Sequence, residues 1–260
     1  SDDPPLVAPA VTRTGWLYVV NQTGHSVAVF DEGFDGGLPP APTLTGDVAP
    51  ARLIGPPEGT DPFSSANTPK MVYPTGIALD RANDILYVSN RDAAALEDLS
   101  GRRIVAFAGA RSTRGDVAPR WVLEGPADLT TLKRPSGLWL VDDPNLNDTV
   151  ADDRLFVANR GNQTVLVFQG LSEMVSAAPA SSDRAPTWTI FSSLIQPIGL
   201  AFNSAVNELY VSDGGNNSIQ ALNVGGLAAD VPSLYIAPRV ISGNLTGLIA
   251  PYGLALDPGR

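Results

Sequence analysis

Residues 208–222 read "ELYVSDGGNNSIQAL", and this stretch decides the fold. Two apolar runs flank an Asp, two Gly and two Asn, the composition of a β-hairpin turn. Similar hairpins are found in three further places, "GWLYVVNQTGHSVAVF" at 15–30, "ILYVSN" at 85–90 and "DRLFVANRGNQTVLVF" at 153–168. The chain therefore repeats one supersecondary unit.

Each unit contains two more strands. A Pro-x-Gly signal precedes an apolar strand at Pro74, Pro135, Pro197 and Pro251, with separations of 61, 62 and 54 residues. These strands, such as "GIAL" and "GLAF", carry small apolar residues on both faces, which predicts an innermost position. Short strands introduced by Ala-Pro begin at Ala49, Ala118, Ala185 and Ala237. Proline at the start of a strand favours an edge, so we expect these strands outermost.

Four strands per unit predict an all-β fold, a four-bladed β-propeller of four-stranded antiparallel blades that forms one domain over 1–260. The blades are expected at 74–125, 135–193 and 197–243, with a first blade assembled from 15–57 and 251–260. In this arrangement the C-terminal strand pairs with the N-terminal hairpin and closes the ring, which removes exposed strand edges. Exchange of that strand between two copies, a strand-swapped dimer, is the alternative.

The hairpin "LYVSDGGNNSIQAL" resembles the NHL repeat, and "PTGIALD" followed by "LYVSN" is similar to repeats of the NHL-like and YncE-like bacterial exported propellers. The resemblance covers almost the whole chain. It implies the blade fold, and it implies no single chemistry, because such families include six-bladed lactonases, peptide-processing lyases and many binding modules.

Composition excludes several classes of function. The net charge of −10 and the pI of about 4.5 argue against a nucleic-acid partner, because a phosphate backbone would repel the chain. The absence of cysteine excludes disulfides, thiolate catalysis and Cys-ligated zinc. No apolar run approaches the roughly 20 residues of a transmembrane helix.

The polar, proline-rich start "SDDPPLVAPA" is typical of the tail left after an export signal is removed. We therefore expect an exported protein, periplasmic or extracellular. Membrane or surface association through an upstream anchor stays open.

One set of candidate ligand-binding residues follows the second strands. Its members are Asn21, His25, Asn90, Arg91, Asn159, Arg160, Asp213 and Asn216. Convergent amides and guanidinium groups suit a carboxylate or a sugar. The alternative is that each Asn or Asp caps its own turn.

A second set follows the inner strands and consists of Asp80, Asp142, Asn203 and Asp257. If these side chains converge on the propeller axis, they offer oxygen ligands for Ca²⁺, the one cofactor that the sequence suggests. Turn capping is again the alternative.

Long irregular segments carry aromatic residues, among them Phe63 and Tyr73, which are candidates for contact with a partner. The single histidine, His25, is expected to be a solvated loop residue, and motifs of nucleophilic, phosphate-binding and dinucleotide-binding sites are missing. We therefore expect a non-enzymatic module that binds a protein or glycan through loops on one face. The alternatives are a metal-dependent hydrolase or lactonase with a cation on the axis, and a structural subunit of an extracellular assembly.

Overall fold

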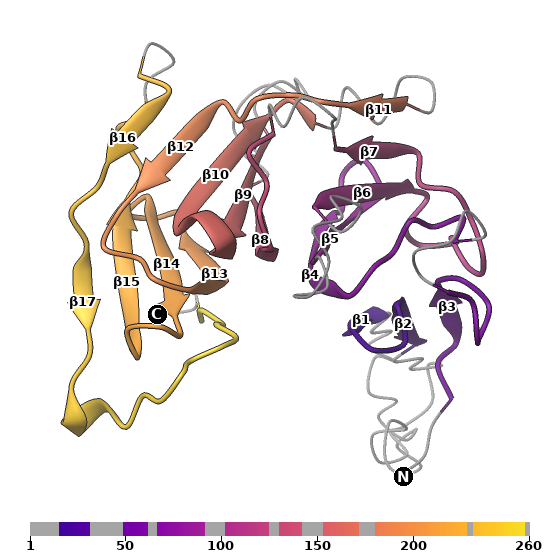
Figure 1. Cartoon of the computed structure of the whole chain (residues 1–260), viewed down its shortest axis with the longest axis horizontal. Helices are drawn as coiled ribbons and strands as arrows, with labels where there is room; N and C mark the ends of the chain where they lie inside the picture. Colours follow the sequence, from indigo (N-terminus) through magenta and orange to yellow (C-terminus); the bar gives the residue numbers. More distant parts are fainter. Residues whose placement is uncertain are drawn as a thin grey trace, which may run out of the picture.

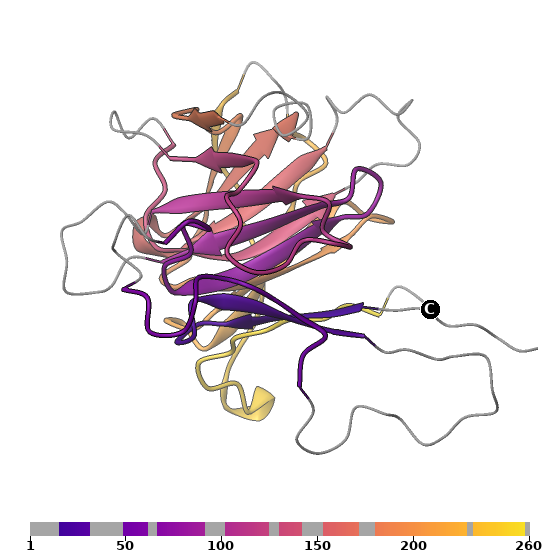
Figure 2. The ribbon, with the colours of Figure 1, turned by 90° about the vertical axis from the view of Figure 1, so that its right-hand side faces the viewer.

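The computed structural model describes residues 16–31, 49–61, 67–91, 102–124, 130–141, 153–171, 180–227 and 231–257. Nearly all regular structure in these ranges is β-strand, with two short 3₁₀ turns, η2 (Arg160–Asn162) and η3 (Asn244–Thr246). The strands form four small sheets arranged as a four-bladed β-propeller (Figures 1 and 2). The predicted fold class is confirmed.

Each sheet is built around one of the repeated hairpins. The first contains β1 (Trp16–Asn21), β2 (Ser26–Asp31) and β3 (Arg52–Ile54). The second contains β4 (Pro74–Asp80), β5 (Ile85–Asn90), β6 (Arg103–Ala108) and β7 (Trp121–Leu123), with β11 (Ala180–Ser182) added at its edge. The third contains β8 (Pro135–Val141), β9 (Arg154–Asn159), β10 (Thr164–Gln169) and β12 (Trp188–Phe191), with β16 (Ser233–Tyr235) added. The fourth contains β13 (Pro197–Asn203), β14 (Glu208–Asp213), β15 (Ser218–Asn223) and β17 (Arg239–Ile241).

The added edge strands come from the following repeat. Strand β11 pairs in parallel with β7, and β16 pairs in parallel with β12. A parallel bridge between Ile54 and Gly115 repeats this contact between the first and second blades. In the second, third and fourth repeats, the connection before the Ala-Pro strand thus contacts the outer edge of the preceding blade. These contacts were not predicted from the sequence, because they join segments that are far apart in the chain.

The Pro-x-Gly strands lie innermost because their backbones approach one another too closely for a side chain. A Cβ atom added to Gly76 would lie 2.3 Å from the Ser136 carbonyl oxygen, and one added to Gly137 would lie 2.3 Å from that of Ile198. Glycine is the residue that permits this approach. The predicted inner position of β4, β8 and β13 is confirmed.

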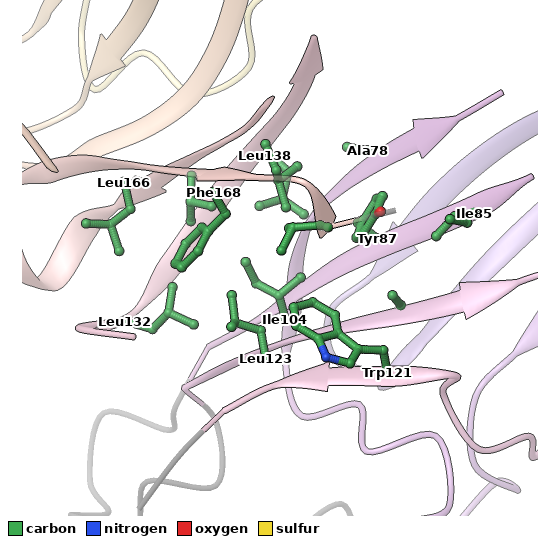
Figure 3. Close-up of a cluster of buried hydrophobic side chains, with 14 residues drawn as sticks. Ala78, Ile85, Tyr87, Ile104, Trp121, Leu123, Leu132, Leu138, Leu166 and Phe168 are labelled. Atoms are coloured by element: carbon green, nitrogen blue, oxygen red, sulfur yellow. The ribbon is translucent and has the colours of Figure 1, made fainter. Parts of the chain in front are cut away.

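Apolar clusters between adjacent blades form the core. Figure 3 shows the cluster between the second and third blades, where Tyr87, Trp121, Leu138 and Phe168 pack together. Similar clusters join the first blade to the second and the third to the fourth. Stacking of amphipathic sheets on both faces is what stabilises such a repeat architecture.

The predicted closure of the ring requires correction. Among the described strands β1 pairs with β2 alone, and residues 251–257 form no strand. These residues lie against the fourth blade. A Cβ atom added to Gly199 on β13 would lie 2.2 Å from the Tyr252 carbonyl oxygen, and the Ser212 hydroxyl on β14 donates a hydrogen bond to that oxygen at 2.5 Å. Figure 1 shows β1 and β13 on opposite sides of an opening in the ring. Contacts with the fourth blade therefore hold the C-terminal segment away from β1.

Candidate binding rim

The loops that enter the inner strands and the turns that leave the second strands lie on one side of the propeller. Asn90 lies opposite Pro74, Asn159 opposite Pro135 and Asp213 opposite Pro197 in the strand pairs. We call this side the entry rim. It comprises residues 21–25, 70–73, 91, 131–134, 160–163, 195–196 and 213–217.

Two of the predicted amides on the rim are buried and bind backbone groups. The Asn159 side chain accepts a hydrogen bond from the Lys133 N–H at 2.7 Å and donates one to the Thr131 carbonyl at 3.0 Å. Asn90 accepts from the Val72 N–H at 3.1 Å in the same way. These amides fix the loop that enters their own blade, in keeping with the turn-capping alternative.

Asp213 has the corresponding role in the fourth blade. Its fully buried carboxylate accepts hydrogen bonds from the backbone N–H groups of Ile195 at 2.9 Å and Gln196 at 2.7 Å. The side-chain amides of Asn216, at 2.7 Å, and Gln220, at 3.2 Å, also donate to it. Several donors offset the cost of burying a charge. Asn216 is therefore a partner of Asp213, and it also donates to the Ser193 carbonyl.

In the first blade the equivalent residue, Asn21, is exposed, and its side chain accepts a hydrogen bond from the nearby Gly24 N–H at 3.3 Å. The expectation that His25 is a solvated loop residue is wrong. Its ring is half-buried and contacts Tyr73 edge-on, with ring centroids 4.6 Å apart, and its Nδ1 atom accepts a hydrogen bond from the Tyr73 N–H at 3.0 Å. Burial lowers the pKa of His25. His25 thus joins the first blade to the second.

The two predicted arginines lie at equivalent positions on the rim. Arg91 is half-buried, and its backbone N–H donates to the Tyr73 carbonyl at 3.1 Å. Arg160 donates from Nη2 to the Gln196 side chain at 2.8 Å, across the boundary between the third and fourth blades. The structure therefore places both guanidinium-bearing residues on the same rim.

Further basic residues on this rim were not singled out from the sequence. They are Lys70, which pairs with Glu124 at 3.2 Å, and the exposed residues Lys133 and Arg134. Lys133 and Arg134 directly precede the Pro-x-Gly signal of the third blade. Their place before that signal could have identified them, because the repeat puts every such loop on the entry rim.

The two aromatic candidates for contact with a partner, Tyr73 and Phe63, do not have the same outcome. Tyr73 belongs to the rim and has a left-handed backbone conformation, with φ of 44°. Phe63 lies outside the described residues.

The predicted calcium ligands include Asp142, which also lies outside the described residues. Asp80 accepts hydrogen bonds from the Asn83 backbone and side chain at 2.8 and 2.9 Å, and Asn203 accepts from the Ala205 N–H at 3.1 Å. Both side chains cap turns, and Asp257 is exposed. In the ranges that the structure covers, no three His, Cys, Asp or Glu residues gather as metal ligands. The described residues do not fit a calcium site.

Asp80 has one further effect. The Tyr87 hydroxyl is buried between the second and third blades, and burial raises its pKa. The charges of Asp80 and Asp153 raise that pKa further. The phenol therefore stays neutral.

Comparisons with known proteins assign no activity to this chain. No family profile matches the chain, and no curated protein matches it. Among solved structures, the chain is similar to Kuenenia stuttgartiensis hydrazine synthase, with 16% identity and a TM-score of 0.46 over 87% of this chain and 46% of that one. It is also similar to a functionally unknown protein from Desulfotomaculum acetoxidans DSM 771, with 10% identity and a TM-score of 0.48 over 95% of this chain and 59% of that one. The chain spans about half the length of these proteins. Across the described ranges, no helix has the length and apolarity needed to cross a membrane.

Proposed function

We propose that this protein is a non-enzymatic, exported binding module of the NHL-like type, and that its entry rim binds a protein or glycan partner that presents carboxylate groups. The observation that carries the proposal is the charge of the rim. Five basic residues lie along it, in a chain whose net charge is −10: Lys70, Arg91, Lys133, Arg134 and Arg160.

In the described part of the rim, basic residues outnumber acidic ones. The Asp213 carboxylate is buried beneath the surface and bound by N–H donors. Glu124 neighbours the rim and contacts both Lys70 and Arg103, each at 3.2 Å. Lys133 and Arg134 are exposed side by side in the sequence. A row of cations on a rigid rim attracts anionic partners, and guanidinium groups bind carboxylates in two-pronged geometry.

The hydrogen bonds beneath the rim also favour binding. The buried amides of Asn90 and Asn159 fix the entering loops, so the cationic side chains project from a preorganised backbone. Preorganisation lowers the entropic cost of binding. The one imidazole of the chain is engaged through Nδ1 with the Tyr73 backbone.

Charge reversal on the rim tests the proposal. The variant Lys133→Glu with Arg134→Glu changes the rim, and the variant Arg81→Glu with Arg114→Glu makes the same change of charge at exposed residues beyond the opposite ends of the strands. Binding of immobilised polygalacturonate and poly-glutamate is measured for both variants and the parent, with neutral dextran as the negative probe.

The rim variant should bind at least about 10-fold more weakly than the parent, and the control variant should bind like the parent. Binding by the parent should weaken in about 0.5 M salt, because exposed charges are screened over a few ångströms there. Equal losses in both variants, or no binding of either polyanion by the parent, would reject the proposal. Hydrolysis of a lactone or ester panel by the parent would favour the enzyme alternative.

A further inference from the structure

One row of paired residues crosses the third blade at the end that carries the entry rim. In the strand pairs Tyr235 lies beside Phe191, Phe191 lies opposite Thr164, and Thr164 lies opposite Asn159. Asn159 in turn lies opposite Pro135, at the start of the inner strand β8. The row therefore runs through all five strands of this sheet, in the order β16, β12, β10, β9 and β8 (Figure 1). Since neighbouring strands lie about 4.8 Å apart, the row is roughly 19 Å long.

The outer end of this row is aromatic and exposed. Phe191 and Tyr235 are 45% and 66% exposed. Their neighbours along the two strands, Ile190 and Leu234, pack into the cluster between the third and fourth blades. Because successive residues of a strand point to opposite faces of the sheet, the two aromatic rings lie together on the other face.

Packing of the repeat does not account for these two aromatic residues. In the second blade the register of β6, β7 and β11 places Glu124 and Asp183 at the equivalent outer positions. There Glu124 pairs with Arg103 at 3.2 Å, and Asp183 accepts a hydrogen bond from the Thr130 N–H at 3.2 Å. The same place in the fold thus carries two charged residues in one blade and two exposed rings in the next. Exposed apolar side chains that lie side by side indicate an interaction surface.

The repeat explains why the edge strand β16 stays outermost. Among the described residues its counterpart in the second blade, β11, pairs with β7 alone, although two further Pro-x-Gly signals follow β11 in the chain. Repeats that follow a blade therefore leave its outermost strand at the edge. The exposure of Phe191 and Tyr235 accordingly follows from the position of their strands within the blade.

The middle of the row carries exposed amides. The turn between β9 and β10 contains Asn162 and Gln163, which are both exposed. The Asn162 side chain donates a hydrogen bond to the Thr131 carbonyl at 3.0 Å, which ties the turn to the loop that enters β8. Amide groups donate and accept hydrogen bonds, as the hydroxyl groups of a sugar do. The turn thus places two amides between the aromatic end of the row and its inner end.

The inner end of the row is cationic. Lys133 and Arg134 are both exposed, and they directly precede Pro135. The Lys133 carbonyl accepts a hydrogen bond from the Gly161 N–H at 2.8 Å, and a Cβ atom added to Gly161 would lie 2.5 Å from Cγ of Lys133. The stem of the Lys133 side chain therefore packs against the turn that carries the amides.

We propose that this row binds an acidic polysaccharide; the proposal rests on the proposed function and narrows its partner class. A uronic acid unit has a face of C–H groups that stacks on the negative face of an aromatic ring, hydroxyl groups that bond to amides, and a carboxylate that pairs with a cation. An acidic peptide chain pairs with the cations but has no such C–H face. The row offers the three kinds of contact in one line, from the rings through the amides to the cations: Tyr235, Phe191, Gln163, Asn162, Lys133 and Arg134.

The test compares immobilised polygalacturonate with poly-glutamate, because both carry one carboxylate per unit and only the first has a sugar ring to stack. Phe191→Ala combined with Tyr235→Ala should weaken binding of polygalacturonate by about 10-fold or more and leave binding of poly-glutamate within about 2-fold of the parent. Tyr235→Phe keeps the ring and should bind polygalacturonate like the parent. Val206→Ala is the matched control, because Val206 is exposed in a turn at the opposite ends of the strands, and it should bind both polyanions like the parent.

Phe191→Leu combined with Tyr235→Leu repeats the test with apolar side chains that lack a flat ring, in case the alanine variant melts below the parent. A parent that binds neither polyanion would reject both the proposed function and the polysaccharide partner. Binding of poly-glutamate alone, or equal losses of both polyanions in the aromatic variants, would overturn the polysaccharide partner and leave the cationic rim as a site for an acidic protein. Polygalacturonate binding that is unchanged in both aromatic variants would also overturn it.

Discussion

The imidazole of His25 links the first two blades through Tyr73. Its Nδ1 atom accepts a hydrogen bond from the Tyr73 backbone N–H at 3.0 Å, and the two rings meet edge-on with centroids 4.6 Å apart. Because Nδ1 is the acceptor, the contact requires the neutral ring with its proton on Nε2. Protonation of Nδ1 would break it.

We therefore expect stability to fall as His25 is protonated. Burial lowers the pKa of His25 in the folded state below the ordinary value of about 6.5, so protons bind the unfolded chain more readily. The contribution of His25 is complete above about pH 6.5 and is lost as the pH falls through the lower folded-state pKa. The measurement is the melting temperature between pH 8 and pH 5.

His25→Asn is the matched control for this prediction. Asn217 already makes the equivalent contact in the fourth blade, with a similar left-handed backbone, so Asn should keep the hydrogen bond at position 25 without titrating. The variant should lose less of its melting temperature between pH 7 and pH 5 than the parent does. Identical pH profiles would show that His25 does not couple stability to pH.

Replacement of Asn159 by Ala should destabilise the fold by about 1–3 kcal/mol. The substitution removes a buried side chain that accepts a hydrogen bond from the Lys133 N–H and donates one to the Thr131 carbonyl. Asn21→Ala, at the exposed equivalent position of the first blade, should cost less. Urea denaturation of both variants compares them, and a larger loss for Asn21→Ala would contradict the role assigned to the buried amide.

Gly137→Ala should also destabilise the fold, by about 1–3 kcal/mol or more. The new methyl group would lie 2.3 Å from the Ile198 carbonyl oxygen of the neighbouring inner strand, so the two blades would have to separate. Gly226→Ala is the control, because its methyl group would meet no atom within 4 Å. Thermal melts should show a loss for the first variant and little change for the second.

Ser212→Ala should loosen the C-terminal segment. The buried hydroxyl accepts a hydrogen bond from the Gly199 N–H at 2.7 Å and donates one to the Tyr252 carbonyl at 2.5 Å. Its removal should make residues near 250 more susceptible to limited proteolysis, with Ser204→Ala, in an exposed turn, as the control. Equal cleavage rates in the two variants would show that this hydroxyl does not anchor the segment.

The repeats made the blades predictable from sequence. Pro-x-Gly signals, alternating apolar residues and hairpin turns are local features, and each fixes a strand within a few residues of its signal. The inner position of β4, β8 and β13 followed because strands with small apolar residues on both faces must be buried on both faces. The turn-capping alternative for Asn90, Asn159 and Asp213 was also accessible, since Asn and Asp bind nearby backbone groups at turns.

Contacts between blades depended on the tertiary structure. The parallel edge strands β11 and β16, the contact of His25 with Tyr73 and the attachment of Tyr252 to Ser212 each join residues that are distant in sequence. Which edge a segment covers depends on the stacking angle and spacing of whole blades, and no local pattern encodes these quantities. The sequence by itself therefore determined the repeated blade and the order of its strands, whereas the tertiary structure decided which blade holds the last strand and which basic side chains share a rim.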